Sequence, residues 1–264
     1  MAVVRTRSPL EAGLLDVERR ERITAHLRRT STARIADLAV ALGVSAMTVR
    51  RDAEKLAASG VIERVRGGVR ILRAPVTEEP APSEKAALHP EAKERIARAA
   101  LALVRPGSAV GIGGGTTTLA LARLLADVPD ITIVTNSLPV ALALPDHDSL
   151  VMIGGERSRS DALVGPVANR AAASIGLDQL FLGAHGIDAD RGCTAPSLAE
   201  AETNRALMAA TRETVAMIDA SKWGVQGLAA FADLGELDTL VTDASLPHAQ
   251  TREVRRTIGR VLLA

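Results

Sequence analysis

Short apolar runs alternate with helical stretches from residue 84 to the C-terminus. The first of these stretches, residues 90–104, repeats apolar residues at helical spacing behind a charged start, as expected for a helix that packs against a sheet. Runs of four to six apolar residues separated by helices predict a mostly parallel α/β sheet. The strands are expected at residues 108–112, 131–135, 150–154, 179–183, 214–218, 239–242 and 260–263.

A different pattern precedes this region. Residues 35–42 carry apolar side chains at helical spacing, Gly43 and Val44 turn the chain, and Ser45 is suited to cap a second helix. On a helical wheel, one side of this second helix is apolar. That side consists of Ala46, Val49, Ala53 and Leu56.

The opposite side of the second helix is basic. Arg51 points almost directly away from the apolar side, and Met47, Thr48 and Lys55 flank it. A helix that presents this surface can enter the major groove of DNA, with Arg51 at the base edges. Arg50 lies to one side, where it can contact a phosphate oxygen.

Residues 61–72 alternate apolar and charged positions around a Gly67–Gly68 turn, which predicts a two-stranded ribbon. Its apolar positions are Val61, Val65, Val69 and Ile71, and its basic positions are Arg64, Arg66 and Arg70. An ordinary helical hairpin is the alternative explanation for two amphipathic helices alone. A capped basic helix followed by an arginine-rich ribbon favours a DNA-binding unit.

Composition shifts divide the 264 residues into parts. We expect a flexible N-terminus at 1–15, a DNA-binding domain at 16–73, a proline-interrupted linker at 74–83 and an α/β domain at 84–264. Residues 1–73 carry a net charge of +7 and the rest carries −6. A basic end on an acidic body suits a protein that neutralises DNA phosphates with one domain only.

Cys193 is the only cysteine, which excludes a disulfide framework and a cysteine-based metal cluster. The sequence contains no run of roughly 18 to 20 apolar residues, and its N-terminus lacks the apolar core of a signal peptide. We therefore expect a cytoplasmic protein that has no membrane partner, cofactor or metal.

The run GIGGGTTT, residues 111–118, lies between a predicted strand and a predicted helix. Consecutive glycines let backbone N–H groups approach a ligand, and the helix start behind them favours an anion such as phosphate. The run matches neither the spaced glycines of dinucleotide sites nor a P-loop, because the P-loop lysine is missing. A flexible turn is the alternative.

Two long segments resemble one family. The run RRERITAHLRR, followed by IADLAVALGVSAMTVRRDAEKLAASGVIERVRGGV, closely resembles the winged helix-turn-helix of DeoR-type transcriptional regulators. Downstream, GGGTTTLALA, ITIVTNSLPVA, MIGGERS, LVGPVA, LFLGAHGID and DASKWG follow in the order of that family's C-terminal sensor. The resemblance implies a Rossmann-like sensor domain, similar in fold to ribose-5-phosphate isomerase, that binds a phosphorylated sugar or related metabolite.

Carried over residue by residue, the resemblance implies an effector site at the carboxyl ends of the strands. The alternatives are structural: Thr135 and Asn136 could cap a helix, Lys222 and His185 could be solvated, and the glycines and Asp188 could only shape turns. Gly113 and His185 depart from the residues usual in the family, which leaves the effector open. The implied set is Gly113, Gly114, Gly115, Thr116, Thr117, Thr118, Thr135, Asn136, Gly154, Gly155, His185, Gly186, Asp188 and Lys222.

A rival hypothesis is an active sugar-phosphate isomerase with a DNA-binding appendage. The isomerases of this fold carry neighbouring carboxylates after a strand, whereas GAHGIDAD keeps Asp188 without them. A DNA-bending architectural protein is weaker still, because the apolar wedge is missing. We therefore expect no enzymatic activity. One winged helix reads a short half-site of operator DNA, so we expect a homodimer or homotetramer, and a repressor of carbohydrate metabolism genes.

Overall fold

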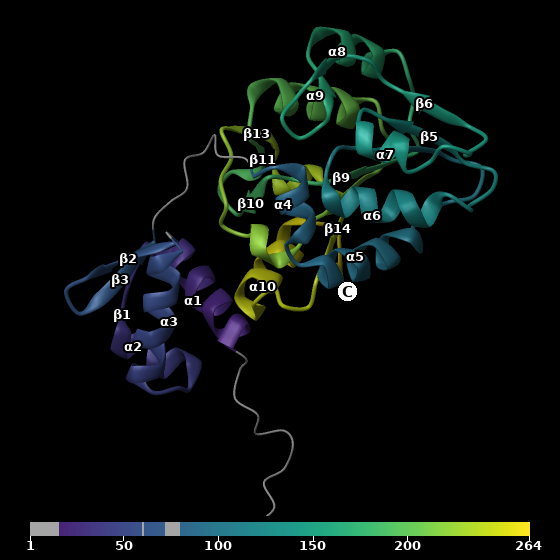
Figure 1. Cartoon of the computed structure of the whole chain (residues 1–264). Coiled ribbons are helices and arrows are strands. Elements are labelled where there is room, and N and C mark those ends of the chain that lie inside the picture. The colour runs from purple at the N-terminus through teal and green to yellow at the C-terminus, as the bar shows by residue number, and fades with distance from the viewer. Residues whose placement is uncertain (1–15, 60, 72–79) are drawn as a thin grey trace, which may run out of the picture. The chain divides into compact units, whose positions relative to one another are not determined.

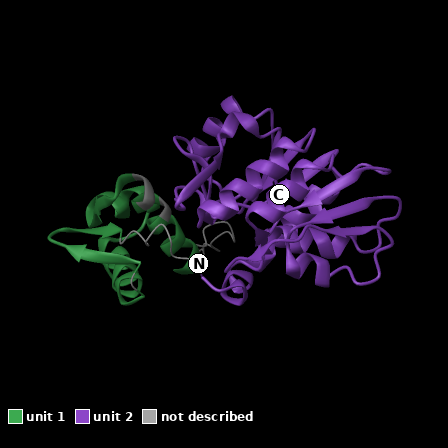
Figure 2. Ribbon diagram, turned by 90° about the horizontal axis from the view of Figure 1, so that it is seen from above, with its two compact units in different colours: residues 1–74 green, residues 75–264 purple. Residues whose placement is uncertain are grey.

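The structure is a computed structural model that describes residues 16–59, 61–71 and 80–264. The chain forms two compact units, residues 1–74 and 75–264 (Figure 2). The predicted flexible N-terminus, 1–15, and residues 74–79 of the predicted linker lie outside the described residues. A helix begins at Pro82, inside the segment expected to be linker.

The described residues of the first unit form three helices, α1 (Asp16–Thr30), α2 (Ile35–Leu42) and α3 (Ala46–Ala58). Gly43 ends α2 in the left-handed conformation at φ 64°, as a glycine after a helix commonly does. The strands β1 (Thr32–Arg34), β2 (Ile62–Val65) and β3 (Gly68–Ile71) form an antiparallel sheet in the order β1-β3-β2. The predicted ribbon is thus confirmed as β2 and β3, with β1 as a third strand.

The core of this unit confirms most of the predicted apolar side of α3. Val49, Ala53 and Leu56 are buried against Leu38 and Ile62, among others. Ala46 was expected on this side but is exposed, because it is the first residue of the helix. Val65 was expected on the apolar face of the ribbon, yet it is 40% exposed next to the turn; Ile62, paired with Ile71, faces the core instead.

A buried ion pair joins α1 to α3. Asp52 is 1% exposed, and its carboxylate accepts hydrogen bonds from Arg19 Nε at 2.5 Å and Arg19 Nη2 at 3.2 Å. Asp16 accepts a third bond from the same guanidinium at 2.8 Å. These two carboxylates raise the pKa of Arg19 above its ordinary value. The Arg19–Asp52 ion pair therefore joins α1 to α3 in addition to apolar packing.

The second unit is built on a seven-stranded parallel sheet (Figure 1). All seven predicted strands are confirmed, each within two residues of the expected bounds. The sheet order is β15-β14-β12-β9-β4-β5-β6. The strands are β4 (Ala109–Ile112), β5 (Thr132–Thr135), β6 (Leu150–Met152), β9 (Gln179–Leu182), β12 (Thr214–Met217), β14 (Thr239–Thr242) and β15 (Arg260–Leu263).

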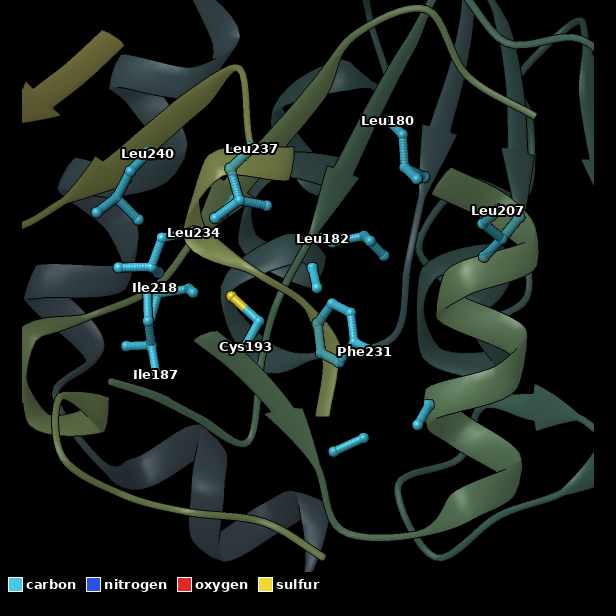
Figure 3. Close-up of a cluster of buried hydrophobic side chains, with 14 of the residues drawn as sticks. Leu180, Leu182, Ile187, Cys193, Leu207, Ile218, Phe231, Leu234, Leu237 and Leu240 are labelled. Carbon is cyan, nitrogen blue, oxygen red and sulfur yellow. The ribbon is translucent and has the colours of Figure 1, made fainter. Parts of the chain in front are cut away.

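Helices cover both faces of this sheet, which gives two apolar clusters. One contains side chains of α5 (Pro90–Leu101), α6 (Thr116–Leu125) and α7 (Leu138–Leu142). The other contains side chains of α8 (Pro166–Ala173), α9 (Leu198–Ala209) and α10 (His248–Thr257). Figure 3 shows part of this second cluster, with Leu207 of α9, Phe231 and Cys193. Cys193 lies in the second cluster, where burial raises the pKa of its thiol to about 12.

Smaller elements stand at the carboxyl end of the sheet. The strands β10 (Gly186–Asp188), β11 (Gly192–Ala195) and β13 (Ala229–Ala232) form an antiparallel sheet, and β7 (Glu156–Arg157) pairs with β8 (Leu163–Val164). The short helix α4 (Pro82–Ala87) precedes α5 and contacts α6. No helix of the described residues has the length and apolarity needed to cross a membrane.

Candidate functional site

Helix α3 presents the residues that the sequence predicted for reading DNA. Ser45 caps it by accepting the Thr48 amide at 3.1 Å, and the two hydroxyls lie 2.9 Å apart. This cap fixes where the helix starts, and with it the direction of the side chains that follow. Met47 is 64% exposed, and Arg50 and Arg51 are also exposed.

The other predicted basic residues differ in their electrostatic partners. Arg64 lies 3.3 Å from Glu54, Arg70 pairs with Glu63, and Lys55 lies 3.5 Å from Asp16. Within the described part of the chain, Arg50, Arg51 and Arg66 form no ion pair. Among the predicted basic residues, these three can therefore bind a DNA phosphate or base without breaking an ion pair within the protein.

A cavity opens in the second unit at the carboxyl ends of β4, β5, β9 and β12, where ligands bind in open α/β sheets. Of the predicted effector residues, it brings together six: Gly114, Gly115, Thr116, Asn136, His185 and Lys222. Other residues complete the lining from α4, α5, α9 and the loops that follow the strands.

The glycine run forms one wall of the cavity. Gly115 precedes α6 at φ 148°, a conformation that favours glycine, and Thr116 begins the helix. The first N–H groups of an α-helix have no intrahelical acceptor, so they are available to an anion. Gly113 lies behind the wall: it is buried, and its amide donates to Phe181 O at 2.9 Å, extending the pairing of β4 with β9.

The buried threonines near this wall bond to the backbone. Thr118 Oγ1 donates to Gly113 O at 2.8 Å and to Gly115 O at 3.0 Å, so it holds the shape of the glycine run. Thr135 Oγ1 donates to Ile112 O at 2.7 Å and accepts from the Ser137 amide at 3.0 Å. Thr117 is 7% exposed and, like these two, is not part of the lining.

Asn136 stands apart from these threonines because it has an unused acceptor. Its side chain is buried, and Nδ2 donates to Leu163 O at 3.0 Å. Oδ1 is buried without a hydrogen-bond partner and belongs to a residue that lines the cavity. A buried acceptor without a donor is unfavourable, so this oxygen marks a place where a ligand hydroxyl or N–H would be stabilising.

Besides Gly113 and the three buried threonines, four more predicted effector residues lie outside the lining. Gly155 adopts φ 154° against the β8 backbone, and a Cβ at Gly186 would meet Val225 O at 2.0 Å. A Cβ at Gly154 would meet nothing within 4 Å. Asp188 Oδ1 accepts from the Arg191 amide at 2.7 Å and Oδ2 from Gln226 at 2.6 Å, so this carboxylate closes the β10–β11 turn.

The cavity contains basic residues that the sequence interpretation did not include. Lys85 and His89 reach it from the α4–α5 junction, and Lys93 from α5. Lys93 is only 5% exposed, and burial lowers its pKa from the ordinary 10.5. Neighbouring Asp219 opposes that shift, and Lys222 adds to it.

Acidic and polar side chains form the rest of the wall. Asp219 is buried and accepts the Ser221 amide at 3.1 Å, and Glu200 accepts from Ser160 Oγ at 2.7 Å. Asn204 lies one helical turn beyond Glu200 on α9. Among the described residues, no group of three or more His, Cys, Asp or Glu side chains could hold a metal ion.

Comparison with known proteins agrees with this two-part geometry. Residues 19–74 match the family described as DeoR-like helix-turn-helix domain, and residues 88–244 match the DeoR C terminal sensor domain. The HTH-type transcriptional regulator GlpR of Haloferax volcanii is 34% identical over 93% of this chain and 96% of its own length. The lactose phosphotransferase system repressor of Streptococcus mutans is 32% identical over 86% of this chain and 91% of its own.

Ribose 5 phosphate isomerase A from Neisseria gonorrhoeae aligns in structure with a TM-score of 0.38 and 20% identity, over 52% of this chain and 54% of its own. The matched families and these relatives are regulators of transcription, which excludes the rival hypothesis of an isomerase. The chain belongs to the DeoR family of transcriptional regulators and joins a DeoR-like helix-turn-helix to a DeoR sensor domain.

Proposed function

We propose that this regulator is a repressor of carbohydrate metabolism genes whose hold on its operator is controlled by a phosphorylated sugar or related metabolite. The observation that carries the proposal is the cavity at the sheet end. It combines a glycine-flanked helix start, buried or lining lysines and an unused buried acceptor, Asn136 Oδ1. Relatives named as repressors, such as the lactose phosphotransferase system repressor, support the direction of regulation.

The DNA-binding part of the proposal rests on α3 and the ribbon. Arg51 contacts a base edge in the major groove, with Met47 and Thr48 beside it, while Arg50 and Arg66 contact phosphates. The pairing with glutamates gives Arg64 and Arg70 a lesser role, because each must leave its partner before it can bind a phosphate. Lys55 is constrained in the same way by Asp16.

In the sensor domain, the anionic group of the effector lies at the start of α6. Backbone N–H groups of Gly115 and Thr116, the Thr116 hydroxyl, and the ammonium groups of Lys93 and Lys222 surround it. Thr117, Thr118 and Thr135 support this wall from behind, together with Gly113. Gly154, Gly155, Gly186 and Asp188 shape the surrounding loops and have no direct contact with the effector.

The sugar part of the effector lies toward the polar wall. Hydroxyl groups donate to Asn136 Oδ1 and Glu200, and His185 and Asn204 contact the remaining edge. Since a site built to hydrogen-bond a hydroxyl strongly rejects a ligand that lacks it, this wall selects among phosphorylated sugars.

A charge placed at the start of α6 tests the proposal. Thr116→Glu adds a carboxylate where the phosphate is expected, yet an acidic residue in the first turn favours the helix itself. Thr116→Gln has the same length and no charge, and it is the matched control. Operator affinity is measured with and without ribose 5-phosphate, glucose 6-phosphate and galactose 6-phosphate. We expect the wild type and Thr116→Gln to respond, and Thr116→Glu to bind operator normally without responding.

An undiminished response in Thr116→Glu would place the effector elsewhere, and no response by the wild type to any phosphorylated sugar would overturn the effector class. The operator for this assay is selected from a pool of random duplexes. Because one winged helix reads only a short half-site, the proposal includes a homodimer or homotetramer that acts in the cytoplasm. Analytical ultracentrifugation of the full chain measures that assembly directly.

A further inference from the structure

We propose that Lys93 is a positioning residue that transmits the charge of the effector to α4, the first helix after the DNA-binding unit. The inference rests on the proposed effector site. It describes how the binding of an effector there is transmitted out of the cavity. It starts from a hydrogen bond inside the sensor domain: Lys93 Nζ donates to the backbone carbonyl of Lys85. That bond joins a buried cation of the cavity to the last turn of α4.

Helix α4 is the part of the sensor domain that the chain enters first. It begins at Pro82, eight residues after Ala74 closes the first unit. Three residues that line the cavity come from α4 and its junction with α5: Lys85, Leu88 and His89. One wall of the effector cavity is therefore formed by the segment through which the sensor domain connects to the DNA-binding domain.

Lys93 is fixed at one end and adjustable at the other. Its helix, α5, buries Ile96, Ala97 and Ala100 against the sheet, so the backbone of Lys93 cannot follow a small shift of α4. Its ammonium group, in contrast, sits on four rotatable bonds and has three donors. Asp219, buried across the cavity, is the opposite charge that keeps the ammonium group in place.

The bond to Lys85 O also helps to close α4. The same carbonyl accepts the Leu88 amide at 3.3 Å, which is the final turn of the helix. A helix of six residues is too short to be stable alone, so α4 depends on such contacts. None of its residues is buried, and other contacts of α4 include the Glu84 bond to the Ala81 amide at 3.1 Å and packing against α6.

A phosphate at the start of α6 competes for this ammonium group. The full negative charge of a phosphate attracts an ammonium group more strongly than the dipole of a neutral carbonyl does. When the effector binds, Lys93 Nζ therefore turns from Lys85 O to the anion, and α4 loses its link to α5. The attachment of the DNA-binding domain, which precedes α4 in the chain, then changes.

Removing the ammonium group should imitate the bound effector. In Lys93→Met without any ligand, we expect the amides of α4 to exchange hydrogen as quickly as in wild type saturated with the responding sugar phosphate. Operator affinity should equal that of the saturated wild type, a change of about 5- to 150-fold, with no further response to ligand. Lys93→Arg keeps a cationic donor and should restore slow exchange and part of the response.

Arg98→Met is the matched control, because it removes an exposed cation from the same helix, where Arg98 pairs with Glu94 at 2.6 Å. It should leave exchange, affinity and response at wild-type values. The proposal is overturned if unliganded Lys93→Met keeps the wild-type exchange and operator affinity, which would leave Lys93 as a ligand contact only. If the wild type responds to no phosphorylated sugar, the proposed function and this inference both fail. If the wild type responds but Lys93→Met behaves like unliganded wild type, only this inference fails.

Discussion

Arg51 and Arg66 are both exposed arginines without an ion pair among the described residues, yet they lie on elements with different access to DNA. Arg51 is on α3, whose outer face enters the major groove, so Arg51→Ala should weaken operator binding by about 1–3 kcal/mol and relax preference at one base pair. Arg66 lies in the turn between β2 and β3, so Arg66→Ala should weaken operator and random DNA equally and reduce the salt dependence by about one charge.

Titration of both variants against operator and random duplexes, at several salt concentrations, separates the two roles. Equal weakening of operator and random DNA by Arg51→Ala would make Arg51 a phosphate contact only. Glu54→Gln, which leaves Arg64 without its acceptor, serves as a control that frees a cation rather than removing one.

Lys93 leads to a prediction about pH. Burial lowers its pKa below 10.5, so the unliganded protein loses this charge at a lower pH than an exposed lysine does. A phosphate binds best to the charged form, and binding therefore takes up a proton once the pH exceeds that pKa. Effector affinity should fall as pH rises within the range below 10.5. The phosphate itself does not titrate there, because its second pKa is near 6.

Calorimetric titration between pH 7.5 and pH 10 measures this effect. Lys93→Arg keeps its charge across the whole range, so its affinity should decline less than that of the wild type. The groups facing Lys93 are Asp219, Lys222 and Lys85, and they are present in both proteins. Parallel curves for the two proteins would show that Lys93 does not meet the anion.

The same residues show how far sequence can identify a site. Gly114, Gly115 and Thr116 were predicted because a glycine run before a helix start leaves backbone N–H groups open to a ligand, and the structure places all three in the cavity lining. Lys93 was not predicted, since in EAKER it looks like one more solvated charge, whereas in the structure it is buried, bonds to Lys85 O and lies near Asp219. Asp188 shows the reverse: its position after a strand suggests a ligand contact, whereas three-dimensional neighbours such as Gln226 occupy its carboxylate.

At the scale of elements, the Arg19–Asp52 pair makes α1 and α3 depend on each other. Removing one partner of a buried ion pair leaves the other charge uncompensated, which typically costs about 3–5 kcal/mol. Because Arg19 keeps its bond to the exposed Asp16, Asp52→Ala should lower the free energy of unfolding of the first unit by about 3 kcal/mol, the lower end of that range. Glu54→Ala on the same helix removes an exposed pair, and we expect a change of about 1 kcal/mol or less.

Urea denaturation followed by circular dichroism at 222 nm measures both variants. The full chain is used, and the unfolding midpoints of wild type, Asp52→Ala and Glu54→Ala are compared. A cost for Asp52→Ala no larger than that for Glu54→Ala would mean that apolar packing alone joins α1 to α3.

Elements differed in how well the sequence predicted them. The parallel strands were predictable because strands buried on both faces read as continuous apolar runs, as in QLFLG and TVAMI. Strand β1 was not, because three residues, Thr32 to Arg34, are too short to show a period. Helix α4 lies in a proline-containing segment that reads as a linker, and Pro82 in fact occupies the first turn of the helix.

At the scale of the whole molecule, the effector and the operator must act on each other reciprocally. If the effector lowers operator affinity by a given factor, the operator lowers effector affinity by the same factor, because both follow from one coupling free energy. For typical regulators this free energy is about 1–3 kcal/mol. The structure gives the coupling a short covalent route, since the cavity wall begins with α4, directly after the segment that joins the two units.

We therefore expect the dissociation constant of the responding sugar phosphate to rise in the presence of saturating operator DNA, by the factor that the sugar phosphate imposes on operator binding. Calorimetry with and without operator measures one factor, and fluorescence anisotropy of labelled operator measures the other. In Lys93→Met both factors should approach one together, because the route through α4 is already interrupted. Two unequal factors in the wild type would show that the effector also changes the assembly of the chain, since reciprocity holds only when both titrations connect the same states.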